Sequence, residues 1–140
     1  MIKAMIKDQS RAMLLGRVLL YLFGVGFMLL GVRYFADPRA LTGEGDLVLP
    51  NAKAMMEIRT VYGGMFAGLG LTLAVLSLRA SDVPTGLRVL IMVAGLVAAA
   101  RIGGIALGQA PDTLFAAMLG IEIVGIVLAV IALHGIGKAS

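Results

Sequence analysis

The chain has 140 residues, of which 60% are hydrophobic and only 14% are charged, and its net charge is +4. A soluble globular domain carries roughly 25% charged residues, so this composition excludes an ordinary water-soluble fold. There is no cysteine and a single histidine, which excludes disulfides, thiolate chemistry and the usual zinc and iron–sulfur sites. We therefore expect no metal site and no cofactor, and composition alone assigns no catalytic residue.

Four apolar runs approach or exceed the roughly 20 residues that an α-helix needs to cross a hydrocarbon core. They cover residues 12–32, 60–78, 89–110 and 113–133. Helices satisfy every backbone polar group internally, as lipid requires. The sequence therefore predicts an all-α fold, a four-helix transmembrane bundle that forms a single membrane domain over residues 1–140.

The first run has a rival interpretation as a secretory signal peptide, because Lys3, Lys7 and Arg11 precede an apolar stretch. Cleavage after Ala36 would place the bulky Tyr34 at the −3 position, where a small residue is needed. We expect the run to remain in the chain as a helix.

Lysine and arginine placement predicts the orientation. Seven such residues lie on the N-terminal side of the spans and four on the opposite side, which favours both termini in the cytoplasm. In a bacterium this predicts a multi-pass protein of the cell inner membrane, with residues 34–59 as a periplasmic loop. Turn residues such as Pro38, Gly43 and Pro50 favour irregular structure there.

Glycines inside the spans predict close helix packing, because small residues let backbones approach each other in lipid. The spacing is i, i+4 within the second and third runs. These faces fit packing within one chain or between chains, and we favour packing within the chain. The predicted packing positions are Gly64, Gly68, Gly104, Gly108 and Gly125.

Two charged residues interrupt the last two runs, Arg101 in the third and Glu122 in the fourth. A hairpin that turns at Ala110 and Pro111 places both at matching depth, near the middle of a core about 30 Å thick. An isolated charge there costs about 2.5 to 3.5 kcal/mol, so we predict a contact that forms a buried polar pair. The pair either only joins the two helices or marks a polar pocket or proton path.

The second run is headed by the segment Glu-Ile-Arg-Thr-Val-Tyr-Gly-Gly, which contains Glu57, Arg59 and Tyr62. These residues fit interfacial anchoring at a periplasmic mouth, since an acid suits a first helical turn and tyrosine suits the membrane interface. The alternative is that Glu57 or Arg59 gates a cavity whose floor is Arg101 and Glu122.

The Glu-x-Arg-x-x-Tyr-Gly-Gly segment, Arg101 in a glycine-rich run leading to Gly108-Gln109-Ala110-Pro111, and Glu122 in the last run together carry a resemblance. The chain resembles, over nearly its whole length, a bacterial family of four-helix membrane proteins catalogued as a domain of unknown function. The resemblance implies the same four-helix fold and the same polar positions. It supplies no activity, substrate or partner.

Three classes of function remain open. The first is non-enzymatic: the bundle binds a lipophilic ligand or packs against a second copy or another membrane partner, because no nucleophile and base stand together. The second is a small oligomeric transporter or proton-coupled carrier, in which Glu122 exchanges a proton beside Arg101. The third is an enzyme on a membrane-soluble substrate, with Glu122 or Glu57 as acid or base. All three act in the lipid bilayer, and none involves a nucleic acid.

Overall fold

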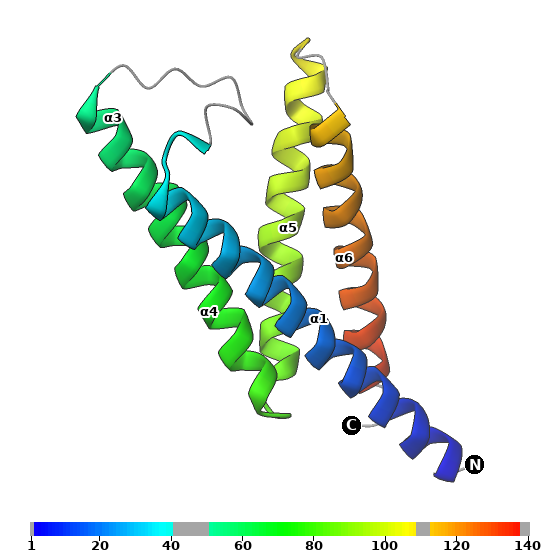
Figure 1. Cartoon of the computed structure of the whole chain (residues 1–140). Coiled ribbons are helices and arrows are strands. Elements are labelled where there is room, and N and C mark those ends of the chain that lie inside the picture. Colours follow the sequence, from blue (N-terminus) through cyan, green and yellow to red (C-terminus); the bar gives the residue numbers. More distant parts are fainter. Residues whose placement is uncertain (1, 41–50, 109–112, 138–140) are drawn as a thin grey trace. The chain divides into compact units, whose positions relative to one another are not determined.

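A computed structural model describes residues 2–40, 51–108 and 113–137. In these ranges the chain forms α1 (Ile2–Ala36), α3 (Ala52–Glu57), the π-helix η1 (Ile58–Gly64), α4 (Met65–Leu78), α5 (Val83–Ala106) and α6 (Thr113–Gly137) (Figure 1). Because α3, η1 and α4 follow one another without a break, they make one continuous helix of changing type.

Four helices within the described ranges are long and apolar enough to cross a membrane. They cover Lys7–Ala36, Ala52–Leu78, Val83–Ala106 and Thr113–Gly137. Large apolar side chains such as Leu29 and Leu96 are exposed on them, as expected where lipid and not water is the solvent. The all-α, four-helix transmembrane fold is thereby confirmed.

The ends of the helices differ from the ends of the apolar runs, because hydropathy marks only the apolar part of a helix. The second helix begins at Ala52 rather than residue 60, and Asn51 caps it by accepting a hydrogen bond from the Ala54 nitrogen at 3.0 Å. The third ends at Ala106 rather than residue 110. Helical residues therefore occupy both ends of the predicted loop 34–59. The turns predicted at Gly43, Pro50, Ala110 and Pro111 lie outside the described residues.

The chain divides into two compact units. We call Tyr21–Val75 the glycine unit, and Met1–Leu20 with Leu76–Ser140 the hairpin unit. The first half of helix α1 belongs to the hairpin unit, and its second half belongs to the glycine unit. The single membrane domain over residues 1–140 stays a prediction.

In the glycine unit, α1 lies antiparallel to η1 and α4, and glycines form the contact (Figure 1). A Cβ added to Gly24 would lie 2.8 Å from the Ala74 nitrogen, and one added to Gly70 would lie 2.5 Å from the Gly24 oxygen. Two turns further along α1, Gly31 meets Gly63 in the same way, with its added Cβ 2.7 Å from the Gly63 oxygen. Side chains at these positions would force the backbones apart.

The two glycines predicted to pack in this helix, Gly64 and Gly68, instead face away from α1. Both are exposed, and a Cβ added to either meets nothing within 4 Å. The contact uses Gly63 and Gly70, which are seven residues apart. Seven residues return to within about 20° of the same face of an α-helix, whereas four residues drift by about 40°. An i, i+4 glycine pair therefore does not by itself identify the packed face.

In the hairpin unit, α5 and α6 lie side by side and antiparallel (Figure 1). The first half of α1 packs at the end where α5 begins and α6 finishes: a Cβ on Gly16 would lie 2.8 Å from Val83 Cγ1, and one on Gly135 would lie 2.6 Å from Ala12 Cβ. The buried residues of this end are Leu19, Leu20, Val83, Leu87, Leu90, Ala129, Ala132 and Ile136.

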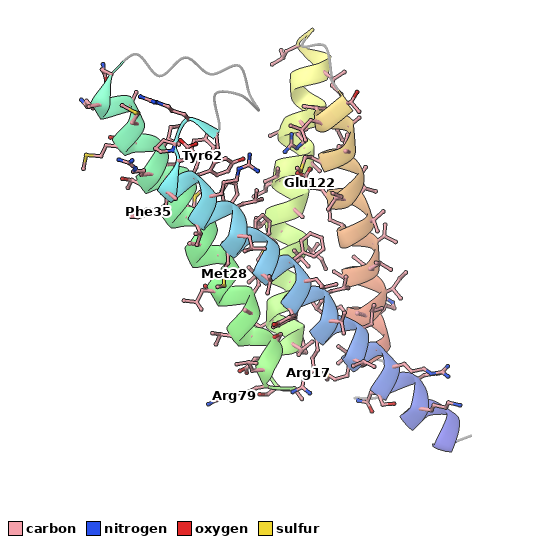
Figure 2. All side chains as sticks on the ribbon, viewed as in Figure 1. Arg17, Met28, Phe35, Tyr62, Arg79 and Glu122 are labelled. Atoms are coloured by element: carbon pink, nitrogen blue, oxygen red, sulfur yellow. The ribbon has the colours of Figure 1, made fainter. Side chains whose placement is uncertain are left out.

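Arg17 is held at this end by protein groups. Its Nε donates to the Ser77 carbonyl oxygen at 3.1 Å and its Nη2 donates to the Leu78 carbonyl oxygen at 2.5 Å (Figure 2). These carbonyls belong to the last turn of α4, which has no basic residue of its own. A cation there satisfies orphan carbonyls and opposes the helix dipole. Arg17 therefore caps α4.

Candidate functional site

One face of α5 is buried along the helix until it reaches Arg101. The face contains Leu87, Leu90, Ala94, Ala98 and Arg101, spaced by three or four residues. Exposure rises from 0% at Leu87 to 6% at Ala98, and the Arg101 side chain is 29% exposed. Arg101 therefore lies at the end of the buried stretch of this face.

Arg101 meets Glu122 across the hairpin. Its Nε donates a hydrogen bond to Glu122 Oε1 at 3.0 Å, which makes the two an ion pair. Glu122 lies on the face of α6 that also carries the buried Gly125 and Ala129, and it points toward α5 (Figure 2). The structure thus brings the two charged residues together. With side chains 29% and 15% exposed, the pair is partly buried.

The depths of the two residues match less closely than the apolar runs predict. Arg101 lies five residues, or about 8 Å, before the end of α5 at Ala106, whereas Glu122 lies nine residues, or about 14 Å, after Thr113. Side chains lean toward the N-terminus of their own helix. Because the helices are antiparallel, the Arg101 side chain points away from the C-terminal end of α5, whereas the Glu122 side chain points toward the N-terminal end of α6. These opposite directions close the difference in depth and allow the ion pair.

Phe115, which is not among the residues predicted from the sequence, completes the site. The Arg101 Cζ lies over its ring, 5.3 Å from the centroid. Such a cation–π contact contributes about 0.5 to 1 kcal/mol, and more when it is desolvated. The signal was present: Phe115 lies seven residues before Glu122 on the same helix face, and it is the only aromatic residue of the chain outside residues 21–75.

The second carboxylate oxygen of Glu122, Oε2, is buried, and no described residue gives it a hydrogen bond. A buried polar atom without a partner costs about 1 to 3 kcal/mol. Arg101 has five N–H donors, and among the described residues it donates through Nε alone. Among the described residues, the ion pair therefore leaves one acceptor and several donors without a partner.

The residues of the predicted periplasmic mouth lie in the glycine unit, and they divide. Arg59 Nε donates to the Phe35 carbonyl oxygen at 3.1 Å and so caps the end of α1. The Tyr62 ring meets the Tyr34 ring edge-on, with centroids 6.3 Å apart (Figure 2). Glu57 is exposed. Arg59 and Tyr62 thus engage α1, whereas Glu57 points away from it.

The ion pair and this segment belong to different units. Gating of an Arg101–Glu122 cavity by Glu57 or Arg59 therefore stays a prediction.

The remaining predicted glycines have different roles. Gly125 is buried on the Glu122 face of α6, and Gly104 is half-buried in α5. Gly108, by contrast, lies beyond α5, is exposed, and has nothing within 4 Å of an added Cβ. Its φ of +89° is left-handed, and its nitrogen donates to the Ile105 oxygen at 2.9 Å. Gly108 ends the helix rather than packing it, because glycine tolerates that backbone conformation.

The family model described as Domain of unknown function (DUF4345) matches residues 15–133, which include the Glu57 to Gly64 segment and the Arg101–Glu122 pair. No curated protein and no solved structure matches the chain.

Proposed function

We propose that this chain, which belongs to the DUF4345 family, is a non-enzymatic multi-pass membrane protein that binds a lipophilic molecule at the Arg101–Glu122 site. The observation that carries the proposal is Glu122 Oε2, which is buried and has no donor among the described residues. In lipid there is little water to satisfy such an atom. A membrane-soluble ligand with a polar group would supply the missing partner.

The unused groups of the pair define the chemistry of that ligand. The charges of Arg101 and Glu122 balance, so the site favours a neutral headgroup over a charged one. Arg101 N–H groups need an acceptor, and Glu122 Oε2 needs a donor. A hydroxyl meets both needs, because its oxygen accepts and its proton is donated. The preferred ligand is therefore a long-chain or ring lipid alcohol.

A non-enzymatic role agrees with the way the acid is held. Glu122 Oε1 is bonded to a guanidinium, which cannot act as a base because arginine remains protonated. Among the described residues, Glu122 has no bonded serine, threonine or histidine that would form a nucleophile and base pair. The site is better suited to binding than to turnover.

The alternative is a small oligomeric transporter or proton-coupled carrier. One observation favours it: Arg101 bonds only one of the two Glu122 oxygens, which leaves the other oxygen for a transported group. Four helices are few for a complete pathway, so this function requires several copies of the chain. A protein that stays monomeric in lipid bilayers would exclude it.

We also propose that the protein lies in the inner membrane of a bacterial cell with both termini in the cytoplasm, supported by the excess of lysine and arginine on the N-terminal side. The chain has no cysteine, so single cysteines test the orientation without background. Ser81→Cys is expected to react with an impermeant maleimide only after the cells are opened, whereas Lys53→Cys is expected to react in intact cells. The reverse pattern would contradict this orientation.

Binding is tested with two probes of equal chain length, oleyl alcohol and 1-octadecene, added to the delipidated protein in detergent. We expect the alcohol to raise the melting temperature more than the alkene does. In the double variant Arg101→Leu/Glu122→Leu this difference should vanish. Leu96→Ala, on an exposed face of α5, serves as the control that should retain it. Equal effects of the two probes on the native protein would refute the proposal.

A further inference from the structure

Four residues on the side of the second helix that meets α1 are spaced by four, and the first two of them lie in η1. Ile58 is buried beside Tyr34. Tyr62 and Phe66 pack against this cluster, and Gly70 is the next residue of the series to contact α1. In a uniform α-helix each four-residue step turns a face by about 40° beyond one full turn. Three steps would carry it about 120° away from α1. Within Ile58–Gly64 the π-helical turns offset part of this drift, because they hold more residues than α-helical turns.

Contacts with the end of α1 hold the π register. Arg59 Nε donates to the Phe35 oxygen at 3.1 Å, and a Cβ added to Gly63 would lie 3.0 Å from Phe35 Cα. The Tyr62 and Phe66 rings, 6.2 Å apart, each contact the Tyr34 ring. In soluble globular proteins, roughly 30–35% of residues are in α-helices and well under 1% are in π-helices. Among these contacts, the Arg59 bond joins a charged donor to the last turn of α1.

The two flanks of η1 are anchored unequally. On the C-terminal side, Gly70 is packed against Gly24 and Met28 of α1. On the N-terminal side, α3 (Ala52–Glu57) has no buried residue. A change of register within η1 would therefore move α3 and leave α4 in place.

We propose that Ile58–Gly64 is a two-register switch in which Arg59, bound to the end of α1, holds the π form. When Arg59 leaves Phe35, the segment becomes α-helical. Each residue on the N-terminal side of the segment then moves to the position that the preceding residue held, which rotates it by about 100° around the helix axis. Ile58 moves to the exposed position of Glu57, and Met56 moves to the half-buried position of Met55. This device is independent of the ligand site proposed above.

The absence of cysteine makes the rotation measurable. Single cysteines replace Met56, which is 67% exposed, and Ile58, which is 9% exposed. Their rates of reaction with a water-soluble maleimide are compared in detergent, with and without Arg59→Met. With Arg59 present, the cysteine at position 56 should react faster. In Arg59→Met the order should invert. An unchanged order would overturn the proposal.

Deletion of Thr60 supplies the matched control. Thr60 is exposed, and its side chain bonds only to the Met56 carbonyl oxygen among the described residues. Removing one residue from a π segment restores an α-helix while both flanks keep their positions. The deletion variant should therefore label as the native protein does, and Arg59→Met added to it should change nothing. A shift that persists in this background would show simple destabilisation and overturn the switch.

The deletion variant also tests the proposal if Arg59→Met fails to fold. The deletion removes the π register without removing the Arg59 contact, so we expect a folded protein with the native labelling order. A folded deletion variant whose cysteine at position 58 reacts faster than that at position 56 would refute the register argument.

Discussion

In the glycine unit, two helices approach so closely that their glycines touch backbone, whereas Arg33 and Asp37 lie at the end of α1 and Arg59 bonds to that end. In the hairpin unit, the packed face of α5 and α6 finishes in an ion pair within the apolar length of both helices. The first arrangement depends on shape and the second on charge. Both are available in lipid, where burial of apolar surface gives no drive to bring helices together.

The difference shows where a function is best placed. A backbone contact through glycines is satisfied in itself and leaves little for a ligand to add. The Arg101–Glu122 pair leaves a buried oxygen that no described residue donates to, in surroundings where each unmet polar group is costly. This is why we place the proposed ligand site in the hairpin unit.

The largest expected effect is on the glycine contact. In Gly31→Leu the new side chain would overlap the backbone of Ala67 and Gly63, so we expect a loss of about 3 kcal/mol or more in the free energy of unfolding. Gly68→Leu, which meets open space, should be neutral or stabilised by helix propensity. Equal stability of the two variants in detergent denaturation would contradict the close backbone contact at Gly31.

The next effect is on the ion pair. Glu122→Leu leaves Arg101 without its partner, which should cost about 3 kcal/mol. The double variant Arg101→Leu/Glu122→Leu should recover most of this loss, because no uncompensated charge remains. The measurement is the free energy of unfolding of both single variants and the double variant. A double variant less stable than either single variant would contradict the account of the pair.

A smaller effect is expected where Arg17 caps α4. Arg17→Met removes two hydrogen bonds to the Ser77 and Leu78 carbonyls and should cost about 1.5 kcal/mol. Arg88→Met, at an exposed position of α5, should change stability by less than about 0.5 kcal/mol. If the melting temperature falls by the same amount in both variants, Arg17 does not cap α4.

The smallest effect is at Phe115. Phe115→Leu keeps an apolar side chain but removes the ring beneath Arg101, so we expect a loss of about 0.5 to 1 kcal/mol. The loss should disappear when Arg101 is already leucine, which a double-mutant cycle measures. A loss that is independent of Arg101 would mean that Phe115 acts through packing alone.

Hydropathy and the cost of charge in lipid predicted much of this molecule. The four apolar runs correspond to four long helices, and the cost of Arg101 or Glu122 alone led to the contact that the structure shows. Both inferences depend on how a residue interacts with lipid and not on which helix lies beside it. The sequence alone is therefore enough to make them.

Features that depend on a neighbouring helix were not predicted. The i, i+4 spacing of Gly64 and Gly68 could not reveal which face α1 would cover, and the useful signal was the seven-residue spacing of Gly24 with Gly31 and of Gly63 with Gly70. The π form of Ile58–Gly64 coincides with contacts to Tyr34 and Phe35 of another helix. A uniform α-helix was the reasonable expectation because no local residue preference specifies a π turn.

Native mass spectrometry tests most directly whether Arg101 and Glu122 form a ligand site, by measuring binding of oleyl alcohol to the native protein and to Arg101→Leu/Glu122→Leu. Thermal unfolding checks that both proteins are folded. If the pair is a ligand site, the native protein binds the alcohol and the folded double variant does not. If both bind it equally, or neither binds it, Arg101 and Glu122 only join α5 to α6, and the account of function is wrong.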